Sequence, residues 1–362
     1  MKVGVFLPSG SLGGAEQVLL QISNAYADKG AVVNVYLLTN INASDFKKRL
    51  RPEVNLISFD ADRESKGIFK FFNHFLLKFK RDNFDYAYSS HVHINAFIAI
   101  LRRFSLIKIK RHIARESTLI FDRFTGNRLR LFDFSYNTGY QNIDLIICQT
   151  ELMKAQLLKH KPKLSEKKVV VINNPITPLS KTYNFSNPYV NKQFLVSAGR
   201  LIPEKGFDIL IDAFKILNQQ NPELELVILG EGKSREILQN QINNEALQQK
   251  IHMPGFADDV YSYFTYAKVC VVSSRIEGFP NVLLQMMACN NHVVSTLCAG
   301  GIDKIKGIIT CNTNDINGLV SAIKKSADTE ENYNREVFDQ YLKANDINNY
   351  IEKIEYLVSH KL

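Results

Sequence analysis

The chain has 362 residues, which is enough for two domains of ordinary size, each with its own core. Hydrophobic residues make up 45% and charged residues 22%, as in a globular protein, and no apolar run reaches the length of a membrane span. The net charge of +9 is unevenly spread: residues 1–180 carry 27 Lys and Arg against 15 Asp and Glu, whereas the remainder carries 18 against 21.

This charge distribution narrows the classes of partner. A basic first half indicates an anionic partner, but no helix-turn-helix, zinc-finger or RNA-binding signature supports nucleic acid. An anionic membrane surface or a pyrophosphate-linked lipid fits better, and a solvated lysine-rich surface is the alternative. The first strand is too short for a signal-peptide core, so the protein is expected to stay in the cytoplasm. The five cysteines have neither disulfide nor zinc spacing.

Strand and helix patterns alternate along the first half. Because alternation of this kind predicts a parallel sheet, ligands are expected at the carboxyl ends of the strands. Gly13 and Gly14 follow the first strand, and a helical stripe over residues 15–29 then ends at Gly30. The glycine spacing differs from the dinucleotide-binding fingerprint. The predicted strands cover residues 3–7, 32–38, 54–57, 86–89, 112–114 and 145–148.

Two of these strands end in polar residues. His91 and His93 follow one, and Arg115 and Glu116 follow another. The histidines are candidates for recognising a hydroxyl-rich acceptor, although a histidine in such a place is more often an ordinary hydrogen-bonding residue.

Residues 68–80 and 97–111 mix Phe, Leu and Ile with Lys and Arg. Core-packing helices with basic outer faces explain them most simply. The alternative is a helix that lies in the interface of the inner membrane leaflet.

Residues 173–191 are rich in Asn and Ser and contain three prolines, which predicts a linker between domains 1–172 and 192–345. A new strand from residue 194 leads into Gly199, Arg200, Lys205 and Gly206, and then into a helix over 207–217. The glycines free the backbone, while the guanidinium and the ammonium can together clamp a diphosphate.

The stretch 273–288 follows an apolar, β-branched strand, turns at Gly278 and opens a helix with Pro280 at its first position. A helix N-terminus carries unpaired N–H groups and about half a positive charge, which suits a phosphate. Glu277 precedes the turn and Gln285 lies inside the helix, so both can face a ligand there. The alternative is a solvated turn residue and a helix-surface residue.

Three motifs together resemble those of retaining nucleotide-sugar glycosyltransferases of family 4, which have the two-domain GT-B architecture. They are Gly-Gly-Ala-Glu at 13–16, Gly-Arg…Glu-Lys-Gly at 199–206, and Glu-Gly-Phe-Pro at 277–280 with a polar residue at 285. In this family the second position of the last motif is normally Glu, which accepts from the ribose hydroxyls. The chain has Gln285 there, so it departs from the family motif at this position.

The resemblance implies two Rossmann-like doubly wound parallel-sheet α/β domains, with a last helix, 346–362, that crosses back to the first domain. It implies a catalytic Glu277 at the donor sugar, with Arg200 and Lys205 on the pyrophosphate in the role that a metal plays elsewhere, and therefore no metal or other cofactor. The implied donor site comprises Gly14, Gly199, Arg200, Lys205, Gly255, Glu277, Gly278, Phe279, Pro280, Asn281, Val282 and Gln285. The implied acceptor site comprises Gly13, Glu16, His91, His93, Arg115 and Glu116.

The expected function is that of a retaining, metal-independent hexosyltransferase. Its expected donor is a nucleoside diphosphate sugar, with uridine favoured, and its expected acceptor is a polyprenyl-diphosphate-linked precursor of O-antigen, lipopolysaccharide or capsule. It is expected on the cytoplasmic side of the inner membrane as a peripheral protein. Two alternatives are a non-catalytic nucleotide-sugar-binding subunit, which Gln285 makes plausible, and a nucleotide-sugar 2-epimerase, which would need acid/base carboxylates in the cleft.

Overall fold

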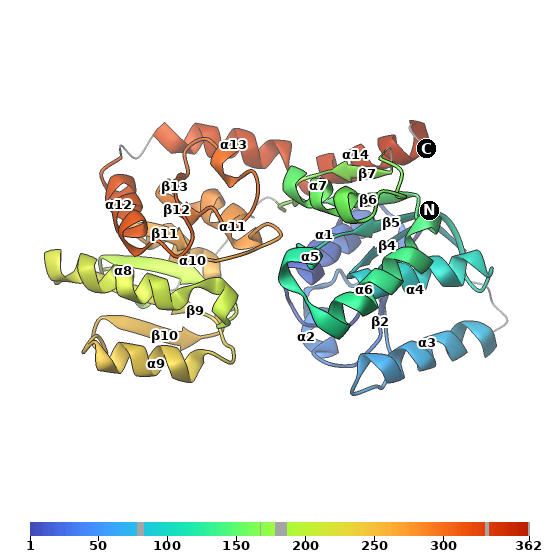
Figure 1. Cartoon of the computed structure of the whole chain (residues 1–362), viewed down its shortest axis with the longest axis horizontal. Coiled ribbons are helices and arrows are strands. Elements are labelled where there is room, and N and C mark those ends of the chain that lie inside the picture. The colour runs from blue at the N-terminus through green and yellow to red at the C-terminus, as the bar shows by residue number, and fades with distance from the viewer. Residues whose placement is uncertain (78–82, 167, 178–186, 330–332, 361–362) are drawn as a thin grey trace. The chain divides into compact units, whose positions relative to one another are not determined.

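The computed structural model describes residues 1–77, 83–166, 168–177, 187–329 and 333–360. The chain folds into two compact units (Figure 1). Unit 1 consists of Met1–Thr177 and Asn345–Leu362, and unit 2 of Pro178–Ala344. Each unit has a parallel sheet covered by helices, so the predicted fold class of two doubly wound α/β domains is confirmed. Among the described residues no helix is long and apolar enough to cross a membrane.

The described part of unit 1 has a seven-stranded parallel sheet in the order β3-β2-β1-β4-β5-β6-β7. The chain leaves β1 toward one edge and returns to the other side of β1 with β4, so the strand order reverses between these two strands. Ligands of open α/β sheets bind at such a switch point. The strands are β1 Lys2–Leu7, β2 Val32–Leu37, β3 Asn55–Ser58, β4 Asn83–Ser90, β5 Lys108–Arg115, β6 Leu145–Cys148 and β7 Val169–Val171.

Helices cover both faces of this sheet (Figure 1). Apolar residues of α1, α2 and α14 form one core with β1 and β2, and those of α3 and α4 form another with Phe6, Tyr36 and Phe84. The helices are α1 Gly14–Asp28, α2 Ala43–Arg49, α3 Glu64–Leu77, α4 Val92–Arg103, α5 Ile120–Arg123, α6 Gly126–Thr138, α7 Glu151–His160 and α14 Ile347–His360, with a short 3₁₀ turn, η1 Tyr140–Asn142.

The two aromatic and basic segments belong mainly to the second of these cores. Phe71 of α3 is fully buried, and Ile98 and Leu101 of α4 pack in the same cluster. The expectation of one helix over 97–111 is wrong, because α4 ends at Arg103 and β5 begins at Lys108. Residues 78–80 of the other segment lie outside the described residues.

The last helix, α14, packs in unit 1. Tyr350, Ile351 and Ile354 lie in the core formed by α1 and β1, and Glu355 accepts a hydrogen bond from the Tyr26 hydroxyl at 3.0 Å. Next to the start of α14, residue Ile176 bridges to Asp346. The chain therefore enters and leaves unit 1 side by side.

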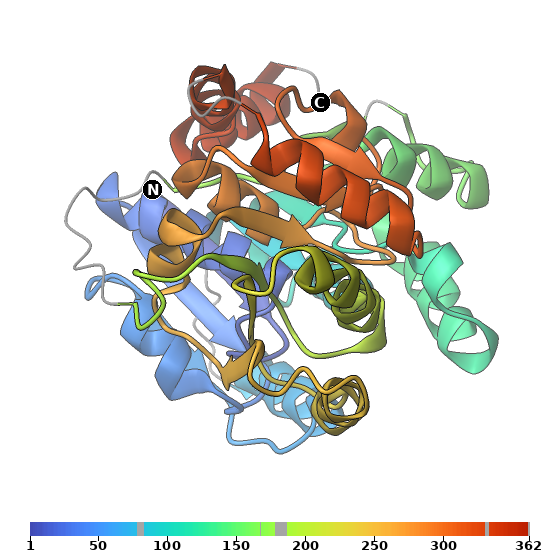
Figure 2. The same cartoon turned by 90° about the vertical axis from the view of Figure 1, so that its left-hand side faces the viewer.

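The described part of unit 2 has a six-stranded parallel sheet in the order β10-β9-β8-β11-β12-β13, which reverses between β8 and β11. Figure 2 shows α8 and α12 on one side of these strands and α10 and α11 on the other. The strands are β8 Phe194–Ala198, β9 Glu225–Leu229, β10 Ile251–Gly255, β11 Val269–Val272, β12 Val293–Thr296 and β13 Ile309–Cys311. The helices are α8 Phe207–Gln220, α9 Arg235–Asn244, α10 Val260–Tyr266, α11 Asn281–Cys289, α12 Ile316–Ala327 and α13 Tyr333–Ala344, with 3₁₀ turns η2 Pro203–Lys205 and η3 Ile302–Lys304.

Both ends of the stretch predicted as a linker are packed into a unit. Asn174 is buried in unit 1, and its side chain donates to Gln149. Asn187 is buried in unit 2 and donates to the Ser262 carbonyl at 3.2 Å. Residues 178–186, between these packed ends, lie outside the described residues.

A buried histidine gives unit 1 a testable pH dependence. Burial lowers the pKa of His112 to about 3, and the nearby Arg102 guanidinium adds to this effect while Asp144 opposes it. Between the usual histidine pKa of about 6.5 and this value, the unfolded chain holds a proton that the folded chain lacks. The free energy of unfolding should therefore fall as the pH falls, by about 2 kcal/mol at pH 5 from this group.

The measurement is urea denaturation at pH 7 and pH 5 of the wild type and of His112→Leu, which cannot titrate there. The variant is expected to be less stable at pH 7, because the Ser89 hydroxyl loses its partner at 2.8 Å, but to lose about 2 kcal/mol less on acidification. Equal losses in the two proteins would show that His112 is not the titrating group.

Candidate active site

The loop after β8 meets the loop after β11, because β8 and β11 are neighbours at the switch point of unit 2. Gly206 lies between them with φ +62°, and a Cβ there would stand 2.2 Å from the Ser273 carbonyl oxygen. Only glycine fits this close approach without strain. The Ser273 hydroxyl donates to the Lys205 carbonyl at 3.0 Å, which joins the two loops again.

These loops bring two predicted catalytic residues into contact. The Lys205 ammonium lies 2.5 Å from Glu277 Oε1, and both side chains are more than four-fifths buried. The Ser274 hydroxyl donates to the same oxygen at 2.9 Å, whereas Glu277 Oε2 accepts no hydrogen bond from the described residues. The Glu277 carboxylate is therefore held by one edge, and its other oxygen is available to a ligand.

The third predicted catalytic residue, Arg200, is exposed, and its side chain bonds to no group in the described part of the chain. It follows Gly199 on the same loop as Lys205. A Cβ on Gly199 would lie 3.3 Å from the Lys205 side chain, so this glycine leaves room for the lysine to reach Glu277. Within the described residues, this loop therefore carries one cation that is paired, Lys205, and one that is not, Arg200, at the carboxyl edge of the sheet.

A salt bridge that the sequence analysis did not predict holds the loop after β8 against the loop after β11. The Arg275 guanidinium makes a two-pronged contact with Asp208, at 2.8 and 2.6 Å, and donates to the Pro203 carbonyl at 2.7 Å. Bonds of this fork type fix geometry as well as adding energy. Its partner Asp208 lies in the first turn of α8, where acidic residues suit the helix dipole, and that placement is the one sequence signal for it.

The helix after Glu277 begins one residue later than predicted. Pro280 is the N-cap of α11, and Asn281 is its first residue. Among the described residues no side chain caps this terminus, so its positive end remains suited to an anion. Gly278, Phe279 and Pro280 are buried, and Val282 in the first turn is half-buried.

Gln285 lies in the second turn of α11, half-buried. Its Nε2 donates to the Tyr261 hydroxyl of α10 at 3.3 Å.

Gly255, another predicted donor-site residue, lies at the end of β10. Its φ is +94°, and a Cβ there would meet the Glu231 carboxylate at 2.8 Å. This backbone conformation requires glycine at position 255. β10 lies two strands from β8, the strand that precedes Lys205.

In unit 1 the loop after β1 leads into α1. Gly13 is the N-cap, Gly14 is the first helical residue, and Glu16 is 93% buried just inside the helix. A Cβ on Gly13 would lie 2.6 Å from Glu16 Oε2. Glycine therefore lets this carboxylate fold back over the start of its own helix.

The end of β4, the other strand at this switch point, provides two histidine–carboxylate pairs. His91 Nε2 lies 3.5 Å from Glu16 Oε1, and His93 Nε2 lies 2.8 Å from Glu64 Oε2. Burial lowers the pKa of His91 while the Glu16 charge opposes it, and the neighbouring His93 imidazole lowers the pKa of Glu64. His91 adopts φ +75°, an uncommon backbone conformation for a non-glycine residue and one often found at functional sites.

The other two predicted acceptor residues are in a different environment. Arg115 is fully buried; its Nε donates to the Tyr350 hydroxyl at 3.0 Å and one terminal nitrogen to Asn174 at 2.8 Å. Its side chain therefore ties β5 to α14 and to the chain that leaves unit 1. This position corrects the expectation that Arg115 faces an acceptor.

Glu116 is buried too, and its carboxylate accepts from the hydroxyls of Tyr136 at 2.6 Å and Tyr140 at 2.5 Å. Burial raises the pKa of Glu116, and the two hydroxyl donors oppose that rise. Like Arg115, Glu116 serves the interior of unit 1 and presents no side chain to a ligand. Sequence placed both at a strand end correctly but could not show which way they point.

Comparison with known proteins gives the family and the fold of the chain. A model described as Glycosyltransferase Family 4 matches residues 12–178, and one described as Glycosyl transferases group 1 matches residues 181–354. The fold is that of Anabaena Alr3699/HepE, solved with UDP and glucose, which has a TM-score of 0.80 and 19% identity over 99% of each chain. The chain is a glycosyltransferase of the GT-B fold.

Relatives of this glycosyltransferase include an uncharacterized glycosyltransferase of Haemophilus influenzae, 25% identical over 92% of each chain. A second, from Campylobacter jejuni, is named N-acetylgalactosamine-N,N'-diacetylbacillosaminyl-diphospho-undecaprenol 4-alpha-N-acetylgalactosaminyltransferase. It is 25% identical over 84% of this chain and 83% of its own. Another relative, from Methanocaldococcus jannaschii, is 29% identical over 48% of this chain and only 44% of its own length.

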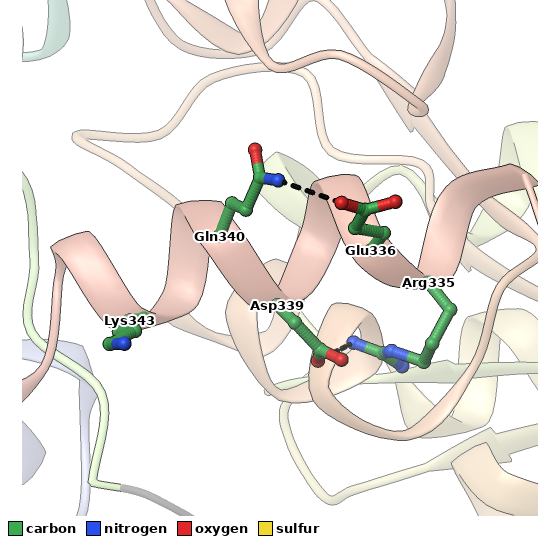
Figure 3. A pocket seen from close by; sticks show the side chains of 5 residues that line it. All are labelled: Arg335, Glu336, Asp339, Gln340 and Lys343. Carbon is green, nitrogen blue, oxygen red and sulfur yellow. Dashed lines mark hydrogen bonds and ion pairs between the residues drawn. The ribbon is translucent and has the colours of Figure 1, made fainter.

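A hollow on α13 of the glycosyltransferase contains none of the predicted site residues (Figure 3). Within it the Arg335 guanidinium pairs with Asp339 at 2.7 Å and also donates to the Met287 carbonyl near the C-terminal end of α11. Glu277 lies before the opposite end of that helix. The hollow is lined by Arg335, Glu336, Asp339, Gln340 and Lys343.

Gln285 gives the first test of the donor site. Because its amide nitrogen is engaged by Tyr261, its oxygen is the group left to accept from a ligand hydroxyl. Gln285→Leu should weaken donor binding by about 1 kcal/mol, or roughly fivefold, whereas Gln285→Glu should bind donor equally or more tightly. Calorimetric titration of UDP measures both, with Tyr261→Phe as the control that removes only the tyrosine hydroxyl. Normal binding by Gln285→Leu would remove this residue from the donor site.

Proposed function

We propose that this glycosyltransferase transfers a sugar from a nucleoside diphosphate sugar, with uridine as the base and with retention of anomeric configuration. The observation that carries the proposal is the Lys205–Glu277 contact at 2.5 Å, together with Arg200, whose side chain pairs with no described residue. Two cations and one carboxylate therefore lie together at the switch point of unit 2. A sugar diphosphate needs positive charge beside its diphosphate and negative charge beside its sugar during transfer. The solved relative that binds UDP supports uridine.

The residues divide the reaction between them. As the bond from the sugar C1 to the diphosphate oxygen breaks, negative charge grows on the diphosphate and positive charge on the sugar. Arg200, Lys205 and the N-terminus of α11 stabilise the leaving diphosphate, while Glu277 offsets the charge of the oxocarbenium-like sugar. A divalent metal ion bound to the phosphate oxygens would neutralise the same charge. We propose that these two cations replace the metal.

The proposed acceptor is a glycan on a polyprenyl diphosphate carrier, a precursor of O-antigen, lipopolysaccharide or capsule at the cytoplasmic face of the membrane. Support comes from the Campylobacter jejuni relative, whose name gives a diphospho-undecaprenol acceptor, and from the basic first half of the chain. Within unit 1, Glu16, His91 and His93 are the proposed contacts for acceptor hydroxyls.

The test is incubation with a panel of nucleotide sugars in chelator, followed by detection of released nucleoside diphosphate and of any transferred sugar. The proposal predicts slow donor hydrolysis, faster transfer when a lipid-linked acceptor is added, and an α-linked product from an α-linked donor. Interconversion of two nucleotide sugars would identify an epimerase instead. Binding without release would identify a non-catalytic subunit, and turnover that requires added magnesium or manganese would contradict the metal-free mechanism.

A further inference from the structure

Helix α6 in unit 1 is apolar on both sides. Its inner side packs Phe132 and Tyr136 into the unit, and Tyr136 is fixed by its bond to Glu116. On its outer side Leu131 and Phe134 are 59% and 65% exposed, three residues apart and therefore on one face of the helix. The inner contacts already hold α6 against the unit. The packing of α6 therefore does not explain why two large apolar side chains are exposed to solvent.

Two arginines lie on the same helix as this exposed apolar pair. Arg128 and Arg130 are exposed on α6, and the Arg128 guanidinium lies 4.4 Å from the centre of the Phe124 ring. The one acid in the middle of α6, Asp133, is bound by Lys161. We call Phe124, Arg128, Arg130, Leu131 and Phe134 the α6 patch; it combines apolar and cationic groups without an unpaired acid of α6.

One residue of the α6 patch, Arg128, lies within electrostatic range of the candidate acceptor residues. Arg128 is close enough to Glu64 for its charge to contribute to that carboxylate's lowered pKa, and Glu64 pairs with His93 at 2.8 Å. Another strongly exposed aromatic residue of unit 1, Phe104, is placed differently: it follows the C-terminal end of α4, whereas His93 lies in the first turn of that helix.

We propose that the α6 patch is the surface on which unit 1 rests on an anionic lipid bilayer. Leu131 and Phe134 would enter the boundary between headgroups and acyl chains, and Arg128 and Arg130 would bind lipid phosphates. A second copy of this chain is a poorer occupant, because two facing patches would bring four arginines together. The inference rests on the proposed function in one respect: a lipid-linked acceptor would bring unit 1 to the membrane.

The test uses the full chain and sedimentation with vesicles of phosphatidylcholine alone or mixed with phosphatidylglycerol. The wild type should bind the mixed vesicles and be released as salt rises, since charge screening shortens to about 8 Å at physiological ionic strength. Leu131→Ser with Phe134→Ser, and separately Arg128→Gln with Arg130→Gln, should each weaken binding about tenfold or more. The matched controls are Phe104→Ser, which is equally exposed, and Lys324→Gln with Lys325→Gln on α12, which removes the same charge. Both should bind within about twofold of the wild type.

Two results would overturn the proposal that the α6 patch binds lipid. One is that the patch variants bind mixed vesicles like the wild type. The other is a concentration-dependent dimer in sedimentation velocity that the same variants abolish. Circular dichroism checks that the variants are folded. Because the apolar pair and the arginine pair are replaced in separate variants, the test still holds if one of the two variants does not fold. Failure of the proposed function has a different signature. If the wild type binds vesicles through the patch but releases no nucleoside diphosphate from any donor, the surface stands and the transferase proposal fails.

Discussion

Glu277→Gln should lower kcat by about 10²–10³-fold, because the carboxylate is assigned to charge that develops in the transition state. The KM for the sugar donor should change by less than about threefold. The variant keeps the shape of the side chain and the bond from Ser274, which can donate to an amide oxygen as it does to Glu277 Oε1. Steady-state kinetics with a UDP-sugar donor measure both constants.

Ser274→Ala is the control for this result, since it removes a hydrogen bond from the same oxygen but leaves the charge. Its kcat should fall by only about tenfold, which corresponds to about 1.5 kcal/mol, the lower value for a hydrogen bond to a charged group. A Glu277→Gln enzyme that turns over normally would take the transition-state role away from this residue. Equal losses in the two variants would mean that position matters here and charge does not.

Arg200→Ala and Lys205→Ala should each weaken UDP binding by about 1.5–3 kcal/mol, which is roughly 10- to 150-fold in Kd. In the protein without ligand the two cations have different surroundings, so Lys205→Ala should lower the free energy of unfolding more than Arg200→Ala does. Arg200 is exposed and unpaired within the described residues, so its loss should leave the unfolding transition unchanged. Lys205 holds the largely buried Glu277, and its loss leaves that carboxylate without a cation.

Calorimetric titration of UDP in chelator measures the affinities, and urea denaturation measures the stabilities. Lys324→Ala on the exposed end of α12 is the control for removal of one positive charge and should bind UDP like the wild type. Two variants that bind UDP normally would show that the diphosphate lies elsewhere. A loss of affinity in Arg200→Ala with an equal loss of stability would mean that the arginine is structural.

Much of this architecture follows from local sequence signals. Short β-branched runs alternating with helical stripes give parallel sheets, and such sheets place strand-end residues at one edge. The positions of Lys205 and Glu277 could therefore be predicted as belonging to one edge of unit 2. Their direct contact could not, because it joins residues 72 positions apart through side-chain packing.

The failures have the same origin. Whether Arg115 points outward or inward depends on Tyr350, which is 235 residues away, and no local pattern encodes that pairing. The break between Arg103 and Lys108 was hidden because the apolar and basic residues of this stretch suit a helix and a strand equally. Exposed Leu131 and Phe134 also gave no signal, since a sequence shows apolar residues but not which of them remain outside.

The most direct test of the donor site compares two residues in contact. Lys205 and Glu277 lie 2.5 Å apart, so damage to a merely structural ion pair would weaken UDP binding in both Lys205→Ala and Glu277→Gln. If Lys205 leaves Glu277 for the diphosphate, the two variants should change affinity in opposite directions. Calorimetric titration of UDP in chelator should then give a Kd about 10-fold or more weaker for Lys205→Ala, and a Kd equal to or tighter than that of the wild type for Glu277→Gln. Comparable losses in both variants, or no change in either, would contradict the account.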